Sequence, residues 1–238
     1  MATIREPANR GVAAPTERAD RHRFIASEAR RLLEWHQGHR RDFPWRFQTD
    51  PYPVAVTELM LVRTRAEQVA KIWPVFFEAY PTLETLAHAP RADVRASLRP
   101  LGLEWRAGRI LSFASAAIQE EDWPDHVSEL PGGGPYIAAA LSVTLNGRGP
   151  LPVDVTIARV IARYWGLHPA GEARRDESVL RASAAMGERS RRFFYAWLDL
   201  AAAVCRPSKP DCERCPLHGC NYRSAHSQSR TSSTFARP

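Results

Sequence analysis

The chain has 238 residues, which is long enough to bury a substantial core in one domain or in two lobes that share it. Its 33 Lys and Arg outnumber its 26 Asp and Glu, and the formal net charge of +7 suits a polyanionic partner without proving one. No apolar run approaches the ~20 residues of a membrane span, and residues 1–23 lack the apolar core of a signal peptide. We therefore exclude the membrane-spanning class and expect a cytoplasmic protein.

Nearly all of the positive charge is arginine, because the only lysines are Lys71 and Lys209. Arginine suits bidentate contacts with phosphates and base edges. It stays protonated, so it cannot form a Schiff base. Chemistry that needs a nucleophilic lysine is restricted to these two residues.

Apolar side chains recur at helical spacing, and no strand-like alternation is found, so the sequence predicts an all-α protein. Prolines and glycines mark the breaks between helices. The predicted helices span 21–38, 54–70 with a kink near 63–65, 67–80, 84–89, 91–99, 105–120, 136–145, 155–164, 176–186 and 190–204. The polar ends, 1–20 and 223–238, are predicted to be a disordered arm and a disordered tail.

Glu58 lies in the predicted helix 54–70 among apolar neighbours. Val56, Leu59 and Met60 leave little polar surface for it, although a glutamate on a helix is most often simply solvated. A half-buried carboxylate tends to have a raised pKa and can donate a proton. Glu58 is therefore a candidate proton donor.

The stretch from Leu130 to Asp154 carries the most informative motif. Gly132, Gly133 and Gly134 precede a predicted helix, where glycines leave backbone N–H groups free to hold a phosphate. Such a turn on its own is more often just a tight connection. Asp154 then stands at the start of the next predicted helix, and the two features together favour a functional site.

This stretch resembles the helix-hairpin-helix and Gly/Pro/Asp signature of the endonuclease III superfamily of DNA glycosylases. The signature is Leu-Pro-Gly-hydrophobic-Gly, then an Asp after an apolar pair, then a helix that ends in Arg-Val-hydrophobic-x-Arg. The matching residues are Leu130-Pro131-Gly132-Gly133-Gly134, Val153-Asp154 and Arg159-Val160-Ile161-Ala162-Arg163. Gly133 and Pro135 depart from the pattern, which loosens the hairpin slightly but keeps the phosphate cradle.

The resemblance covers about residues 24–222 and implies a two-lobed helix-hairpin-helix DNA glycosylase fold. A six-helix barrel lobe would span 51–150, and 21–50 with 151–222 would form a second lobe around a [4Fe–4S] cluster. Double-stranded DNA with a mismatched or damaged base would lie across the cleft between the lobes. We expect a monomer that associates with the nucleoid.

The cysteines, Cys205, Cys212, Cys215 and Cys220, lie close together near the end of the chain. A cytosolic chain has little use for disulfides, and clustered cysteines by themselves favour zinc. Their spacing resembles the superfamily loop that holds a [4Fe–4S] cluster, with one residue fewer in the last gap. The resemblance therefore implies this cofactor in a structural role.

Three arginines are candidate DNA contacts. Arg46 ends Phe43-Pro44-Trp45-Arg46, which resembles an entry segment of adenine and mismatch glycosylases but can also be an aromatic anchor under a loop. Arg63 falls where relatives wedge into the duplex, and a solvated arginine at a helix end is about equally consistent with the sequence. Arg106 follows Gly102-Leu103, which resembles a family loop that supports the DNA backbone.

The resemblance also implies a mechanism in which the C1′–N bond of a flipped nucleotide breaks. Asp154 would stabilise the sugar cation or position the attacking water, and Glu58 would protonate the leaving base. Bifunctional relatives carry a lysine where this chain has Tyr136, which could otherwise be a core tyrosine. We therefore expect a monofunctional glycosylase without efficient β-lyase activity.

The predicted substrate is T or U opposite G in base excision repair. Tyr136, the run 58–64, and Phe43-Pro44-Trp45-Arg46 with Asp50-Pro51-Tyr52 resemble the Mig-type mismatch enzymes. The sequence also ends soon after the cysteines, without the additional domain of MutY-type enzymes. The alternatives are adenine excision opposite 8-oxoguanine or G, and a DNA-binding reader without catalysis.

Overall fold

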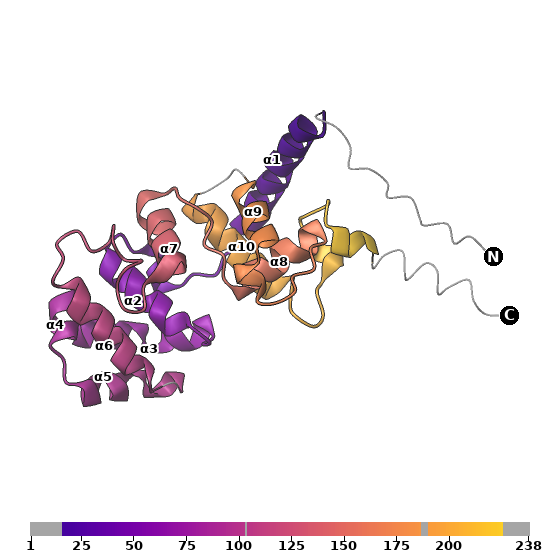
Figure 1. Cartoon of the computed structure of the whole chain (residues 1–238). Helices are drawn as coiled ribbons and strands as arrows, with labels where there is room; N and C mark the ends of the chain where they lie inside the picture. Colours follow the sequence, from indigo (N-terminus) through magenta and orange to yellow (C-terminus); the bar gives the residue numbers. More distant parts are fainter. Residues whose placement is uncertain (1–15, 103, 187–189, 226–238) are drawn as a thin grey trace, which may run out of the picture.

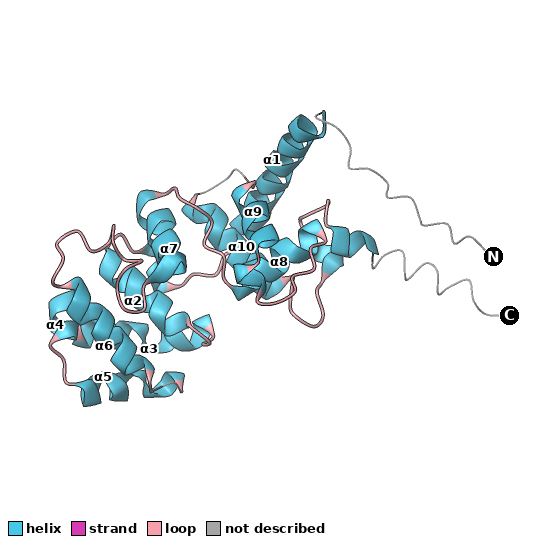
Figure 2. Ribbon diagram, in the orientation of Figure 1, coloured by secondary structure: helices cyan, strands magenta, loops and turns pink. Residues whose placement is uncertain are grey.

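The computed structural model describes residues 16–102, 104–186 and 190–225, and all regular elements in these ranges are helical (Figure 2). The α-helices are α1 (Thr16–Gln37), α2 (Pro51–Leu61), α3 (Ala66–Ala79), α4 (Leu83–Ala87), α5 (Arg91–Leu98), α6 (Arg106–Ala117), α7 (Gly134–Asn146), α8 (Val155–Trp165), α9 (Glu177–Ala184) and α10 (Arg191–Ala203). Short 3-10 helices are η1 (Pro44–Phe47), η2 (Arg99–Leu101), η3 (Ala173–Arg175) and η4 (Cys212–Arg214). The all-α prediction is confirmed for the described part of the chain, where no helix is long and apolar enough to cross a membrane.

Two hydrophobic cores divide the helices into two groups, which are visible side by side in Figure 1. The first core takes its buried side chains from 43–141 and lies among α2 to α7. The second core combines Leu32 of α1 with side chains from 143–217, mainly of α8 and α10. The helix α1 therefore returns to pack against α10, far along the sequence. We refer to these groups as the first lobe and the second lobe.

The segment 39–50 joins the lobes and contributes to both. Phe43 and Trp45 stack on each other and belong to the first core, although the prediction grouped 21–50 with the second lobe. Arg46, the next residue, instead points to Asp199 of α10 in the second lobe. The segment 39–50 therefore contributes side chains to both lobes, and the boundary between the lobes is not a single point in the sequence. We refer to this segment as the strap.

Two predicted element boundaries need correction. The predicted helix 54–70 is two helices, since α2 ends at Leu61 and α3 begins at Ala66, with Arg63 in the left-handed region at φ 55° between them. The helix α1 begins at Thr16, inside the segment 1–20 that was predicted to be a disordered arm, and no proline or glycine interrupts the chain between Thr16 and Gln37. The rest of that arm and residues 226–238 of the predicted tail lie outside the described residues.

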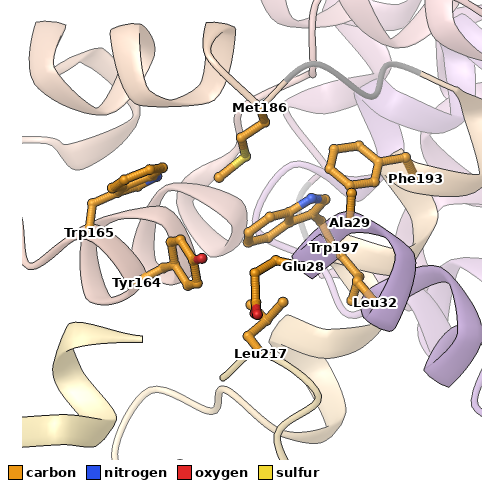
Figure 3. A pocket seen from close by; sticks show the side chains of 9 residues that line it. All are labelled: Glu28, Ala29, Leu32, Tyr164, Trp165, Met186, Phe193, Trp197 and Leu217. Atoms are coloured by element: carbon orange, nitrogen blue, oxygen red, sulfur yellow. The ribbon is translucent and has the colours of Figure 1, made fainter. Parts of the chain in front are cut away.

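The second core borders a small, partly open cavity of about 20 Å³ (Figure 3). Its lining includes Glu28 of α1, Tyr164 and Trp165 of α8, and Trp197 of α10. The Tyr164 hydroxyl and the two indole N–H groups have no hydrogen-bond partner among the described residues. A cavity of this size has room for one water molecule, and a water bound there would give these groups a hydrogen-bond partner.

Candidate active site and nucleic-acid interface

The predicted hairpin ends in the N-terminus of α7, where the chain turns tightly. Gly132 and Gly134 adopt positive φ angles of 87° and 73°, and a Cβ on Gly133 would lie 1.6 Å from the carbonyl oxygen of Val127. No side chain caps α7, and its first turn contains no acidic residue. The uncapped N–H groups and the positive end of the helix dipole therefore favour an anion at this place.

Glu58 of α2 and Tyr136 of α7 meet in the interior, because α2 packs against α7. Glu58 is buried, and the Tyr136 hydroxyl donates a hydrogen bond to its carboxylate. Burial is the main cause that raises the pKa of Glu58 to about 7; the Tyr136 hydrogen bond lowers it, the charge of Asp154 raises it, and that of Arg46 lowers it. Burial also raises the pKa of Tyr136 well above its ordinary value, so this phenol stays protonated.

Asp154 caps the N-terminus of α8 and faces the same pair. Its Oδ1 accepts hydrogen bonds from the backbone N–H groups of Thr156 at 3.0 Å and Ile157 at 2.7 Å, and from the Thr156 hydroxyl at 2.9 Å. Burial raises the pKa of Asp154, and these hydrogen bonds oppose the increase because they favour the ionised form. The cap therefore holds the carboxylate in one orientation.

The two carboxyl groups share one environment and have different tendencies to ionise. The charge of Asp154 is one of the causes that raise the pKa of Glu58. Glu58 accepts only a phenol, whereas Asp154 accepts backbone N–H groups at a helix N-terminus. When two carboxyls interact, the better solvated or better hydrogen-bonded group ionises first. Near pH 7 we infer a partly protonated Glu58, and the hydrogen bonds that Asp154 accepts favour the ionised form of that carboxyl.

A buried ion-pair cluster supports the site from the second lobe. Arg46 donates to both oxygens of Asp199 at 2.7 and 2.8 Å, and Arg41 and His36 also reach this carboxylate. The three donors hold the pKa of Asp199 far below its usual range despite burial. Asp199 therefore fastens the strap to α10 and fixes the positive charge of Arg46 near Glu58.

The sequence did not single out Tyr195, which the structure places at this site. It is a buried residue of α10, and the Arg46 guanidinium lies 4.5 Å from its ring centroid. Burial raises its pKa, a hydrogen bond with Thr144 opposes this, and the charge of Glu58 adds to the increase. The only signal in the sequence was the Tyr195 hydroxyl within the aromatic run Phe193-Phe194-Tyr195. We interpreted that run as part of the apolar face of a helix packed in the core.

Two of the predicted DNA contacts are wrong because their side chains are buried. Arg46 is occupied by Asp199, as described above. Arg106 is 1% exposed, and its Nη1 donates to the Met60 carbonyl oxygen at 2.7 Å and to the Thr64 hydroxyl at 2.6 Å. Both guanidinium groups are buried and hydrogen-bonded within the protein, so in this structure neither is accessible to a DNA phosphate.

Arg63 and the hairpin remain candidates for DNA contact. Arg63 is exposed, and it is the only non-glycine residue with positive φ in the described ranges. Such strain tends to occur at functional positions. Leu130 is buried in the first core, so only its backbone can serve the interface, and Gly132 accepts a hydrogen bond from Arg109 at 3.3 Å.

Cys205, Cys212, Cys215 and Cys220 are free thiols that line one cavity in the second lobe. Within the described residues, no three His, Cys, Asp or Glu side chains are grouped so that they could hold a single metal ion. Four cysteine thiolates are a ligand set that both a [4Fe–4S] cluster and a structural zinc ion can use. Arg163 reaches into this cavity, and its Nη1 lies 3.4 Å from the Cys205 sulfur.

Comparisons with known proteins show which family the chain belongs to. Residues 56–182 match the model of the HhH-GPD superfamily base excision DNA repair protein, which covers both Glu58 and Asp154. The chain belongs to the HhH-GPD superfamily. The predicted family is thereby confirmed.

Individual members of the HhH-GPD superfamily are similar over most of the chain. A thymine/uracil-DNA glycosylase of Methanothermobacter thermautotrophicus is 32% identical over 202 residues, which is 80% of this chain and 90% of that protein. An adenine DNA glycosylase of Mycobacterium tuberculosis is 34% identical over 203 residues, which is 82% of this chain and 67% of that protein. A solved structure of a thermostable thymine-DNA glycosylase superposes with a TM-score of 0.75 at 29% identity and covers 86% of this chain and 99% of that one.

Proposed function

We propose that this protein is a monofunctional DNA glycosylase that removes T or U opposite G. The observation that carries the proposal is the convergence of Glu58, Tyr136 and Asp154 directly behind the uncapped N-terminus of α7. A phosphate held at α7 would bring the neighbouring nucleotide toward these three side chains once it is flipped out of the duplex.

The two carboxyl groups suit cleavage of an N-glycosidic bond. As the C1′–N bond breaks, positive charge develops on the sugar, and the ionised Asp154 would stabilise it. The departing base gains negative charge, and the protonated Glu58 would donate a proton or a hydrogen bond to it. A donor with a pKa of about 7 is well matched to this task near neutral pH.

The absence of a lysine at the site supports hydrolysis without strand cleavage. Tyr136 stands at the position where bifunctional relatives carry a Schiff-base lysine. Its pKa is raised well above the ordinary value for tyrosine, so it is a hydrogen-bond donor rather than a nucleophile. Lys71 and Lys209, the lysines of the chain, are exposed on α3 and in the cysteine loop.

We also propose that the four cysteines hold a [4Fe–4S] cluster as a structural cofactor. The cluster would crosslink the loop 205–220, and the thiols would bind it as thiolates. Burial raises the pKa of Cys215 to about 12, so a bound cation is what would keep this sulfur ionised. Iron and sulfide analysis of the purified protein tests the proposal: about four of each per chain support it, and zinc in their place contradicts it.

The identity of the excised base follows from similarity and has a second candidate. The relative from M. thermautotrophicus is named for thymine and uracil, and this chain spans 90% of it. The relative from M. tuberculosis is named for adenine, and the chain spans 67% of it at a similar identity. Adenine opposite 8-oxoguanine or G is therefore the second candidate.

Single-turnover base release tests the proposed function. Duplexes with T:G, U:G, A:G and A:8-oxoguanine pairs would be incubated with excess protein, and the products would be read with and without alkali. Release from T:G or U:G that needs alkali to cut the strand supports the proposal. Release confined to A:8-oxoguanine or A:G selects the second candidate, and efficient cutting without alkali contradicts the monofunctional mechanism.

Asp154→Asn is the matched control variant. Asparagine keeps the cap of α8, because its side-chain oxygen can accept the same backbone hydrogen bonds. It removes the negative charge, so base release should fall by several orders of magnitude while folding and DNA binding persist. A variant that still releases the base at the original rate would exclude Asp154 from the chemistry.

A further inference from the structure

Glu28 is a buried carboxylate that the proposed chemistry does not use. It lies on α1 and is 4% exposed, on the helix face that also carries Leu32 of the second core one turn later. An acidic side chain is rarely buried to this extent unless its oxygens are paired. Both oxygens of Glu28 have a partner, and one of these partners is the backbone of the cysteine loop (205–220).

The two partners of Glu28 come from different parts of the chain. Arg31 of α1 donates to Oε1, and its side chain is half-exposed. The backbone N–H of His218 donates to Oε2 at 2.8 Å, although the two residues are 190 positions apart. A hydrogen bond with an ionised acceptor is roughly twice as strong as one between neutral groups. The helix α1 therefore holds the cysteine loop at a point between Cys215 and Cys220.

A second contact fixes the same part of the loop. Leu217, which precedes His218, is 3% exposed and belongs to the second core. Its side chain lies next to that of Glu28 at the small cavity (Figure 3). Cys215 and Cys220 also pack against this core. An apolar contact and a charge-assisted hydrogen bond thus act on neighbouring residues between these two thiols.

The beginning of the cysteine loop is held by a different helix. Arg159 of α8 donates to the carbonyl oxygen of Cys205 at 3.1 Å. Arg163 of α8 donates to the carbonyl oxygens of the next two residues at 2.7 and 2.6 Å. These contacts act on 205–207, whereas Glu28 acts on residue 218. Two helices that are far apart in the sequence therefore hold the two ends of the loop.

We propose that Glu28 is a positioning residue of the metal centre that the four cysteines hold. By accepting the His218 N–H, it keeps the span between Cys215 and Cys220 in one conformation, so that both thiols stay at the cavity that the four cysteines line. The inference rests on the proposed metal binding by the cysteines, and it applies to a [4Fe–4S] cluster and to zinc alike. It gives α1 a role in keeping the metal centre in place.

Metal retention in Glu28 variants tests this role. The proteins as purified would be analysed for iron and zinc per chain, and release of the metal to an excess of chelator would be followed over time. Glu28→Ala leaves the His218 N–H without its acceptor. It should release the metal about 10- to 100-fold faster, the range by which loss of an outer hydrogen-bond partner typically weakens metal binding. Glu28→Gln keeps a side-chain oxygen that can accept this N–H, so it should stay close to the wild type.

Two control variants separate this role from a general loss of stability. Glu34→Ala removes an exposed carboxylate of α1. Ile110→Val weakens the packing of the first core, away from the cysteines. Both should release the metal at the wild-type rate. Circular dichroism would verify that every variant is still helical.

The outcomes distinguish the role of Glu28 from the metal site itself. Equal release rates of Glu28→Ala and the wild type would overturn the proposal. Equally fast release from Ile110→Val would also overturn it, since any loss of stability would then free the metal. A wild type that contains neither iron nor zinc would contradict the proposed metal site, and with it the role of Glu28.

Discussion

Replacing Glu58 by glutamine should change how the stability of the protein depends on pH. Folding raises the pKa of this carboxyl from 4.5 to about 7. A group with a raised pKa contributes stability that is fully present below the unfolded value and is lost as the pH rises through the folded value. Since one pKa unit is worth about 1.4 kcal/mol, the wild type should lose roughly 3 kcal/mol between about pH 4.5 and pH 8 through Glu58.

Urea denaturation of both proteins across this pH range measures the effect. The difference in unfolding free energy should shift by roughly 3 kcal/mol in favour of Glu58→Gln as the pH rises. Glu78→Gln, an exposed change on α3, serves as the control and should follow the wild type. Parallel curves for wild type and Glu58→Gln would refute the assignment of a raised pKa to Glu58. Base release by the wild type should decline above about pH 7 for the same reason, because the proton donor ionises.

Three further substitutions test other parts of the structure. Asp199→Asn should destabilise the protein by about 3–5 kcal/mol in urea denaturation, because it leaves buried arginine charge without its counterion. A loss below about 1 kcal/mol would refute the role of Asp199 in holding the strap to α10. The Cβ of Gly133→Ala would lie 1.6 Å from the carbonyl oxygen of Val127. This variant should therefore lose about 1–3 kcal/mol of stability and should not bind a mismatched duplex in a gel-shift assay. Normal binding would contradict the hairpin geometry. Tyr164→Phe should cost about 1 kcal/mol if the cavity beside Glu28 holds water, whereas an unchanged or raised thermal midpoint would indicate a dry cavity.

The helices could be predicted because apolar periodicity and prolines are local signals. The break between α2 and α3 was visible only as a possible kink, because residues 62–65 contain no proline or glycine. Arg63 adopts a left-handed conformation there, which nothing in the sequence indicates. The start of α1 was placed too late because the residues from Thr16 are polar. Helix propensity without an apolar stripe was interpreted as disorder.

Sequence motifs were enough to select candidate site residues. They could not show which side chains pair with residues far away in the sequence. Glu58 was selected from its apolar neighbours and Asp154 from its place after the glycine turn, and the family resemblance supported both and added Tyr136. The fold brings the three together. Arg46 was assigned to DNA because nothing near it in the sequence shows that its partner is Asp199, which lies 153 residues away. A buried arginine and a phosphate-binding arginine cannot be told apart until the partner is known.

Asp154 both caps α8 and carries the negative charge that the proposed chemistry needs, and this has a consequence for mutations at this position. The residue holds the first turn of α8 through hydrogen bonds that asparagine would keep, while the proposed chemistry needs the charge that asparagine lacks. A single nucleotide change can convert an aspartate codon into an asparagine codon. The product would fold, find its lesion and stay there, so in a cell it would compete with intact copies for the same DNA instead of disappearing by degradation. Such a variant should inhibit repair even when the intact protein is also present. Loss of Asp199 removes the ion pair with Arg46 that joins the segment 39–50 to α10, so that variant should lose stability and should not compete with the intact protein for DNA.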